Sequence, residues 1–125
     1  MSVAPIIAPV IAIVDDDPGI RGSLDSLLRS VGMTSMAFSS AEALLASGAE
    51  ARLACIITDL HMPGMTGLEL QAEIARRGWP HPLIMMTAYP TDQSRDQALG
   101  AGATAFLTKP IDPDSLLDAI DSVAI

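Results

Sequence analysis

Short apolar runs alternate with amphipathic stretches along most of the chain. The apolar runs have the length of strands and occupy residues 10–14, 33–38, 53–58, 82–87 and 105–107. Between them, apolar residues recur at helical spacing, which predicts helices over residues 18–31, 40–47, 68–77 and 92–99 and from 113 onward. Strands that are apolar on both faces are typical of a parallel sheet covered by helices on both sides. We therefore predict an α/β fold with a doubly wound, five-stranded parallel sheet and five helices.

Length and composition narrow the class of protein. The chain has 125 residues, which corresponds to one domain and is too short for a catalytic domain joined to a regulatory one. Its formal net charge of −8 argues against nucleic acid or an anionic membrane as the direct partner, because both attract basic surfaces. The one cysteine, Cys55, excludes an internal disulfide framework, and we expect a reducing, cytoplasmic compartment.

The apolar start of the chain is not typical of a membrane helix. Residues 3–14 are interrupted by Pro5 and Pro9, have no basic flank and are shorter than the roughly 20 residues that a membrane span needs. We therefore predict an N-terminal arm over residues 1–8, a folded domain over residues 9–125 and no membrane partner.

Polar side chains follow the predicted strands at the point where each strand ends. They are Asp15, Asp16 and Asp17 after the first strand, Asp59 after the third, Thr87 at the end of the fourth and Lys109 after the fifth. Ligands of doubly wound folds bind outside the carboxyl ends of the strands. We therefore expect these side chains to converge on one site.

The residue types at this edge predict phosphoryl chemistry. Crowded carboxylates need a cation, and Mg²⁺ is a hard ion that prefers oxygen ligands. A carboxylate can attack phosphorus to give an aspartyl phosphate, whose charged oxygens need a metal and a cationic side chain. Lys109, the only lysine of the chain, supplies the cation, and Thr87 supplies a hydrogen bond. The set has the parts needed to accept a phosphoryl group and no evident part for binding ATP.

Other motifs carry less weight. Residues 100–105 match a G-x-G-x-x-A dinucleotide pattern, but they end a predicted helix and precede a strand, which is the reverse of the order that this function needs. Cys55 lies inside an apolar strand and is expected in the core. His81 and Trp79 are expected in a loop, and His61 and His81 do not suggest a metal pair.

Four short runs at the predicted strand ends carry a family likeness. They are residues 13–18, 59–65, 86–88 and 109–110. Together they resemble the receiver domain of two-component response regulators, and the resemblance extends from about Pro9 to the end of the chain. It implies a flavodoxin-like receiver fold with strand order 2-1-3-4-5.

The resemblance also implies a role for each clustered residue. Asp59 would accept a phosphoryl group from a sensor histidine kinase or a phosphotransfer protein. Mg²⁺ would be held by Asp15, Asp16, Asp59 and the backbone carbonyl of His61. Asp59, Thr87 and Lys109 would form the catalytic set, with Lys109 pairing with the phosphoryl group and Thr87 moving toward it. Pro110 would follow a cis bond, and Asp17 and Thr66 would cap helices.

The resemblance further implies a switch formed by Thr87, Phe106 and Tyr89. Thr87 would shift toward the phosphoryl group, and Phe106 would follow into the vacated space. The surface of the fourth helix, fifth strand and fifth helix, with Tyr89 beside it, would then change its affinity for partners. His61 and Tyr89 match positions that tune phosphoryl lifetime in the family. Because bulky side chains there shield the attacking water, we predict slow autodephosphorylation and no other enzymatic activity.

Residues 62–70 look most like receivers that carry a helix-turn-helix DNA-binding domain. This likeness implies control of transcription through an output domain C-terminal to this chain, without direct nucleic acid contact by the receiver itself. A stand-alone receiver remains open, as does a phosphorylation-dependent homodimer.

Two other functions remain open. One is a phosphate-independent interaction module, which the intact set of site residues argues against. The other is a Mg²⁺-dependent phosphohydrolase with an aspartyl nucleophile, for which the short loop over residues 60–66 leaves little room for a general acid or a lid.

Overall fold

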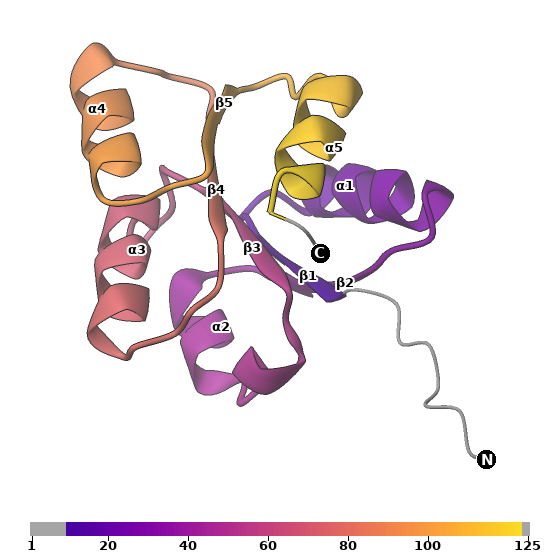
Figure 1. The fold of residues 1–125 in the computed structure, drawn as a ribbon, viewed down its shortest axis with the longest axis horizontal. Coiled ribbons are helices and arrows are strands. Elements are labelled where there is room, and N and C mark those ends of the chain that lie inside the picture. Colours follow the sequence, from indigo (N-terminus) through magenta and orange to yellow (C-terminus); the bar gives the residue numbers. More distant parts are fainter. Residues whose placement is uncertain (1–9, 124–125) are drawn as a thin grey trace.

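The computed structural model describes residues 10–123, so the predicted arm over residues 1–8 lies outside the described residues. Strands and helices alternate along the chain (Figure 1). The strands are β1 (Val10–Val14), β2 (Thr34–Phe38), β3 (Cys55–Asp59), β4 (Leu83–Thr87) and β5 (Ala105–Thr108). The helices are α1 (Pro18–Ser30), α2 (Ala41–Ala46), α3 (Gly67–Arg76), α4 (Asp92–Gly100) and α5 (Pro113–Asp121), with a short 3₁₀ helix, η1 (Glu50–Arg52), before β3.

The five strands form one parallel sheet in the order β2-β1-β3-β4-β5, as predicted. Its register aligns the carboxyl ends of the strands. Val14 of β1 lies opposite Thr58 of β3. Asp59 lies opposite Met86 of β4, and Thr87 lies opposite Thr108 of β5. Residues that follow these strands therefore leave the sheet at a common edge.

Helices cover both faces of the sheet. Figure 1 shows α1 and α5 on one side and α2, α3 and α4 on the other. Alternate strand residues point to opposite faces, so Ile13 and Ile57 pack with α1 and α5, whereas Val14 and Ile56 pack under α2, α3 and α4. The central strands β3 and β4 are buried along their full length, which explains why their sequence is apolar without alternation.

The helix starts follow the capping residues that the sequence predicts. Asp17 caps α1 by accepting a hydrogen bond from the Gly19 N–H at 2.8 Å, with Pro18 in the first helical position. Thr66 caps α3 in a capping box with Glu69. These caps fix where α1 and α3 begin, directly after the strand ends that carry the acidic residues.

The third strand and the segment before it differ from the prediction. The apolar run suggests a strand over residues 53–58, but β3 spans Cys55–Asp59 and η1 precedes it. Leu53 is buried as a core residue without pairing, and Ala54 N–H donates to the Val10 carbonyl at 2.8 Å. At its other end the strand extends further than predicted, because Asp59 pairs with Met86 of β4 and is the last residue of β3. Among residues 10–123, no helix is long and apolar enough to cross a bilayer.

Candidate functional site

The carboxyl edge of the sheet brings together the polar residues that the sequence singled out. Asp15 and Asp16 directly follow β1, Asp59 and Thr87 end β3 and β4, and Lys109 directly follows β5. The three acids and Lys109 line a cleft of about 240 Å³ together with neighbouring loop residues, whereas Thr87 is buried behind it. Its lining consists of Asp15, Asp16, Asp17, Asp59, His61, Ala88, Tyr89 and Lys109.

Three carboxylates form the acidic part of this cleft. Asp15, Asp16 and Asp59 each offer an oxygen, and these oxygens lie within 4.8 Å of one another. Asp15 is fully buried and Asp59 is 5% exposed, whereas Asp16 faces solvent. An all-oxygen set of this size fits a hard divalent cation such as Mg²⁺, which is bound through a few carboxylates and keeps several waters.

Lys109 supplies the positive charge. Its Nζ lies 2.7 Å from Asp15 Oδ2 and 3.3 Å from Asp59 Oδ1. The backbone of Lys109 is held by β4, because its N–H donates to the Thr87 carbonyl at 2.8 Å. The bond from Lys109 to Pro110 is cis, as the family likeness implies. Lys109 therefore bridges two of the three carboxylates.

The environment shifts the pKa of both partners. Burial and the neighbouring charge of Asp15 raise the pKa of Asp59, and the opposing effect of Lys109 does not cancel them. Burial alone lowers the pKa of Lys109, but its hydrogen bond to Asp15 and the charges of Asp15 and Asp59 raise it by more, so that the net shift is upward. The surroundings of Asp59 therefore disfavour the charged form of its carboxylate.

The rest of the carboxyl edge of the sheet is formed by Thr87 and the rings of Tyr89 and His61. Thr87 is fully buried, and its Oγ1 accepts a hydrogen bond from Tyr89 N–H at 3.0 Å. Tyr89 is 75% exposed, and its ring meets His61 edge to face, with centroids 6.2 Å apart. Phe106 is half-buried against the core under α2, α3 and α4, so it lies outside the cleft itself.

Two residues that hold the backbone beside the site were not identified from the sequence. Arg21, in the first turn of α1, donates from Nη1 to the Asp15 backbone carbonyl at 2.8 Å and fixes the chain between the first two acids. Glu42 of α2 accepts from Met65 N–H in the loop after Asp59, at 3.2 Å. No sequence motif indicates either contact, because each depends on how helices and loops pack against one another.

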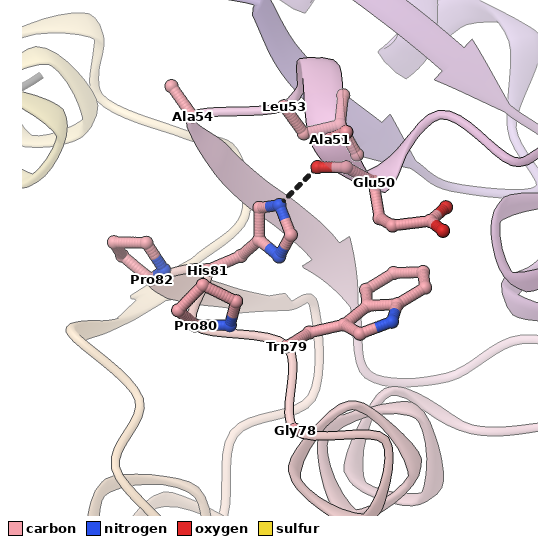
Figure 2. A pocket seen from close by; sticks show the side chains of 9 residues that line it. All are labelled: Glu50, Ala51, Leu53, Ala54, Gly78, Trp79, Pro80, His81 and Pro82. Atoms are coloured by element: carbon pink, nitrogen blue, oxygen red, sulfur yellow. Dashed lines mark hydrogen bonds between the residues drawn. The ribbon is translucent and has the colours of Figure 1, made fainter.

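A larger hollow, about 350 Å³, lies at the opposite edge of the sheet, where β3 and β4 begin (Figure 2). His81 Nε2 lies 2.6 Å from the Glu50 carbonyl oxygen, and its ring meets Trp79 edge to face at 5.5 Å. His81 and Trp79 therefore lie in a loop, as expected. Because this hollow contains none of the clustered carboxylates or Lys109, its size does not make it the better candidate for chemistry. Cys55 is fully buried in β3, which confirms the core assignment.

Comparison with known proteins gives consistent matches. A family model described as the response regulator receiver domain matches residues 11–121. The response regulator protein TmoT of Ectopseudomonas mendocina is 40% identical over 111 residues, which are 89% of this chain and 50% of TmoT. The transcriptional regulatory protein FixJ of Azorhizobium caulinodans is 38% identical over 108 residues, which are 86% of this chain and 51% of FixJ.

Among solved structures, the chemotaxis protein CheY4 of Vibrio cholerae is similar with a TM-score of 0.83 and 28% identity, covering 94% of this chain and 99% of that one. The chain thus spans about half the length of the curated relatives it matches, and nearly all of CheY4.

Proposed function

Because the chain belongs to the response regulator receiver domain family, whose members act as phosphoacceptors in two-component signalling, we propose that Asp59 is the residue that receives the phosphoryl group. The observation that supports this assignment is the convergence of Asp59, Asp15 and Lys109, with Lys109 Nζ 3.3 Å from Asp59 Oδ1. The raised pKa of Asp59 is consistent with a carboxylate poised to react, because such shifts cluster at functional sites.

The transfer is a nucleophilic substitution at phosphorus. A carboxylate oxygen of Asp59 attacks the phosphorus of a phosphohistidine on a sensor kinase or phosphotransfer protein. The new P–O bond forms as the P–N bond breaks, and the donor ring leaves as neutral imidazole after taking up one proton. Lys109 donates a hydrogen bond to one phosphoryl oxygen, and the Thr87 hydroxyl turns to donate to another.

Mg²⁺ is the cofactor that we propose for this step. The carboxylates of Asp15, Asp16 and Asp59 and the backbone carbonyl of His61 would hold it. When bound, the ion would supply positive charge to the phosphoryl oxygens. The support for this proposal is the set of oxygens within 4.8 Å of one another and their net negative charge.

The return step is hydrolysis on the same protein. Water attacks the phosphorus, the P–O bond to Asp59 breaks, and the carboxylate is regenerated as inorganic phosphate leaves. Tyr89 and His61 stand beside the cleft and narrow the approach of that water, so we propose slow autodephosphorylation. We propose no turnover of any other substrate.

The output of the switch follows from the position of α4 and β5. Once Thr87 has turned toward the phosphoryl group, Phe106 moves into the space that it leaves, and the surface formed by α4, β5, α5 and Tyr89 changes. We propose that this surface controls transcription through an output domain outside this chain, as the name of FixJ suggests, and that it supports a phosphorylation-dependent homodimer. The domain would act in the cytoplasm.

The test is phosphorylation with acetyl phosphate and MgCl₂, followed by mass spectrometry of the intact protein. The wild-type protein should gain one phosphoryl group, and Asp59→Asn should gain none. Asp17→Asn is the matched control, because Asp17 lines the same cleft but serves as a helix cap, which Asn also provides. Phosphorylation of Asp59→Asn to the same extent as the wild type would refute the assignment.

A further inference from the structure

The loop between β3 and α3 is closed tightly at both of its ends. Leu60 N–H donates to the Met86 carbonyl of β4 at 2.8 Å, and the Leu60 carbonyl accepts from Gly67 N–H at 2.9 Å. Gly67 must lack a side chain, because a Cβ there would overlap the Asp59 carbonyl oxygen and the Leu60 Cα. The backbone thus fixes both ends of the loop and leaves its middle to be held by side chains.

The middle of this loop is held from outside by α2. Glu42 Oε2 accepts a hydrogen bond from Met65 N–H at 3.2 Å, across a separation of 23 residues. Gly64 lies beneath the same oxygen with φ at +76°, and a Cβ built there would lie 2.5 Å from Oε2. Within residues 10–123 Glu42 forms no ion pair, so the loop backbone is its hydrogen-bonding partner.

The inner side of the same loop faces the acidic cleft. His61 lines the cleft, and its ring contacts Tyr89. Met62, the next residue, is 7% exposed and is part of the core. A short loop with fixed ends and a buried residue in its interior has few ways to relax. A displacement of residues 64–65 can therefore be absorbed only within the few residues that follow Leu60, which include residue 61.

We propose that Glu42 is a positioning residue for the metal site. It holds the outer side of the loop so that His61, and with it the backbone carbonyl assigned to Mg²⁺, keeps its place beside Asp59. This inference rests on the proposed function of Asp59. The role needs an acceptor oxygen and not a negative charge, so Gln should replace Glu42 and Ala should not.

The experiment measures Mg²⁺ affinity directly, by isothermal titration of each variant with MgCl₂ alone. The Glu42→Ala variant should bind Mg²⁺ about three- to tenfold more weakly than the wild type, because it loses one hydrogen bond of this kind. Glu42→Gln should stay within about twofold of the wild type. Glu50→Ala is the matched control, because it removes the same charge from an acid at the opposite edge of the sheet.

A second measurement separates positioning from general damage to the fold. The rate of phosphorylation by acetyl phosphate should need more Mg²⁺ in Glu42→Ala, yet reach the wild-type rate once Mg²⁺ saturates. Urea unfolding in chelator checks that the variant is folded.

The outcomes are distinct. Wild-type Mg²⁺ affinity in Glu42→Ala would overturn the inference, and so would a Glu42→Gln variant that binds as weakly as Glu42→Ala. A depressed rate at saturating Mg²⁺ would overturn it as well. If the wild-type protein itself binds no Mg²⁺ and accepts no phosphoryl group, the proposed function fails, and the positioning role fails with it.

Discussion

Replacing Asp59 by Asn should stabilise the protein in the absence of metal, although Asp59 is the residue that we propose reacts. Its carboxylate is 5% exposed and lies beside those of Asp15 and Asp16, and its pKa is raised by burial and by the charge of Asp15. The amide of Asn has nearly the same shape and no charge. The substitution therefore removes the repulsion and leaves the packing in place.

Coulomb's law gives the size of the effect. With an effective dielectric constant of about 20, two like charges 4.8 Å apart, the outer limit for these carboxylate oxygens, repel by about 3.5 kcal/mol. The attraction between Asp59 Oδ1 and Lys109 Nζ at 3.3 Å is about 5 kcal/mol on the same scale. Before screening, the two repulsions exceed this attraction by about 2 kcal/mol. Asp16 faces solvent, so screening lowers its share, whereas the cost of burying the Asp59 carboxylate adds to the penalty. We expect Asp59→Asn to gain about 1–2 kcal/mol.

The assay is thermal and urea unfolding at pH 7.5, in EDTA and again in MgCl₂. In EDTA the melting temperature of Asp59→Asn should exceed that of the wild type by about 3–8 °C for a domain of this size. In MgCl₂ the wild type should gain stability by mass action, and Asp59→Asn should gain less, because it has lost a carboxylate ligand. The difference between the two proteins should therefore shrink or reverse.

The pH dependence in EDTA has a definite sign. The folded protein binds a proton on Asp59 more tightly than the unfolded chain does, because the folded pKa is the higher one. The loss of stability caused by the charged Asp59 carboxylate is therefore complete above the folded pKa. It is relieved as the pH falls from the folded pKa toward the ordinary pKa of an aspartate. Wild-type stability should approach that of Asp59→Asn in this window. If Asp59→Asn is no more stable than the wild type in EDTA at pH 7.5, the electrostatic reasoning is wrong.

Three further predictions test other parts of the molecule. Burial raises the pKa of Cys55 to about 12, so the native protein should not react with DTNB at pH 8, whereas the unfolded chain should. Fast reaction of the native protein would contradict the burial of Cys55. Tyr89→Ala should release inorganic phosphate faster from phosphorylated protein, because water gains access beside His61, and an unchanged rate would exclude that shielding. Gln71→Met removes the buried hydrogen bond from Nε2 to the Ala98 carbonyl of α4. It should lower the free energy of unfolding in urea by about 1 kcal/mol and speed amide exchange in α4. Unchanged exchange in α4 would show that this bond does not hold the helix.

Most of the fold can be predicted from the sequence, because its signals are local and agree with one another. Apolar runs of strand length, caps such as Asp17 and Thr66, and glycines after helices all indicate the same alternation of strands and helices. The site is predictable for a related reason. A parallel sheet collects its strand ends at one edge, so the residues after each run can be read as neighbours without knowing any distance.

The remaining features depend on distances that no local pattern encodes. The prediction places Asp59 just after its strand, whereas it pairs with Met86 of β4 and is the last residue of β3. Glu42 and Gln71 reach partners 23 and 27 residues away, through contacts of α2 and α3 that only packing determines. Their side chains look like ordinary helix residues in the sequence. The same holds for Arg21, which reaches the carbonyl of Asp15.

The balance of charge in the cleft suits a lysine, and not an arginine, as its cation. Three carboxylates and one ammonium leave two negative charges, the amount that one divalent cation cancels. Lys109 Nζ lies nearer to Asp15, at 2.7 Å, than to Asp59, at 3.3 Å, so it is shared between two acceptors. A phosphoryl group on Asp59 would add negative charge on that side. A compact ammonium on a flexible stem can then move its hydrogen bond across without moving the backbone, whereas a planar guanidinium is suited to one fixed pairing. Arg21 illustrates the fixed role, because it holds the Asp15 carbonyl from α1, and Lys109 is the cation left to respond.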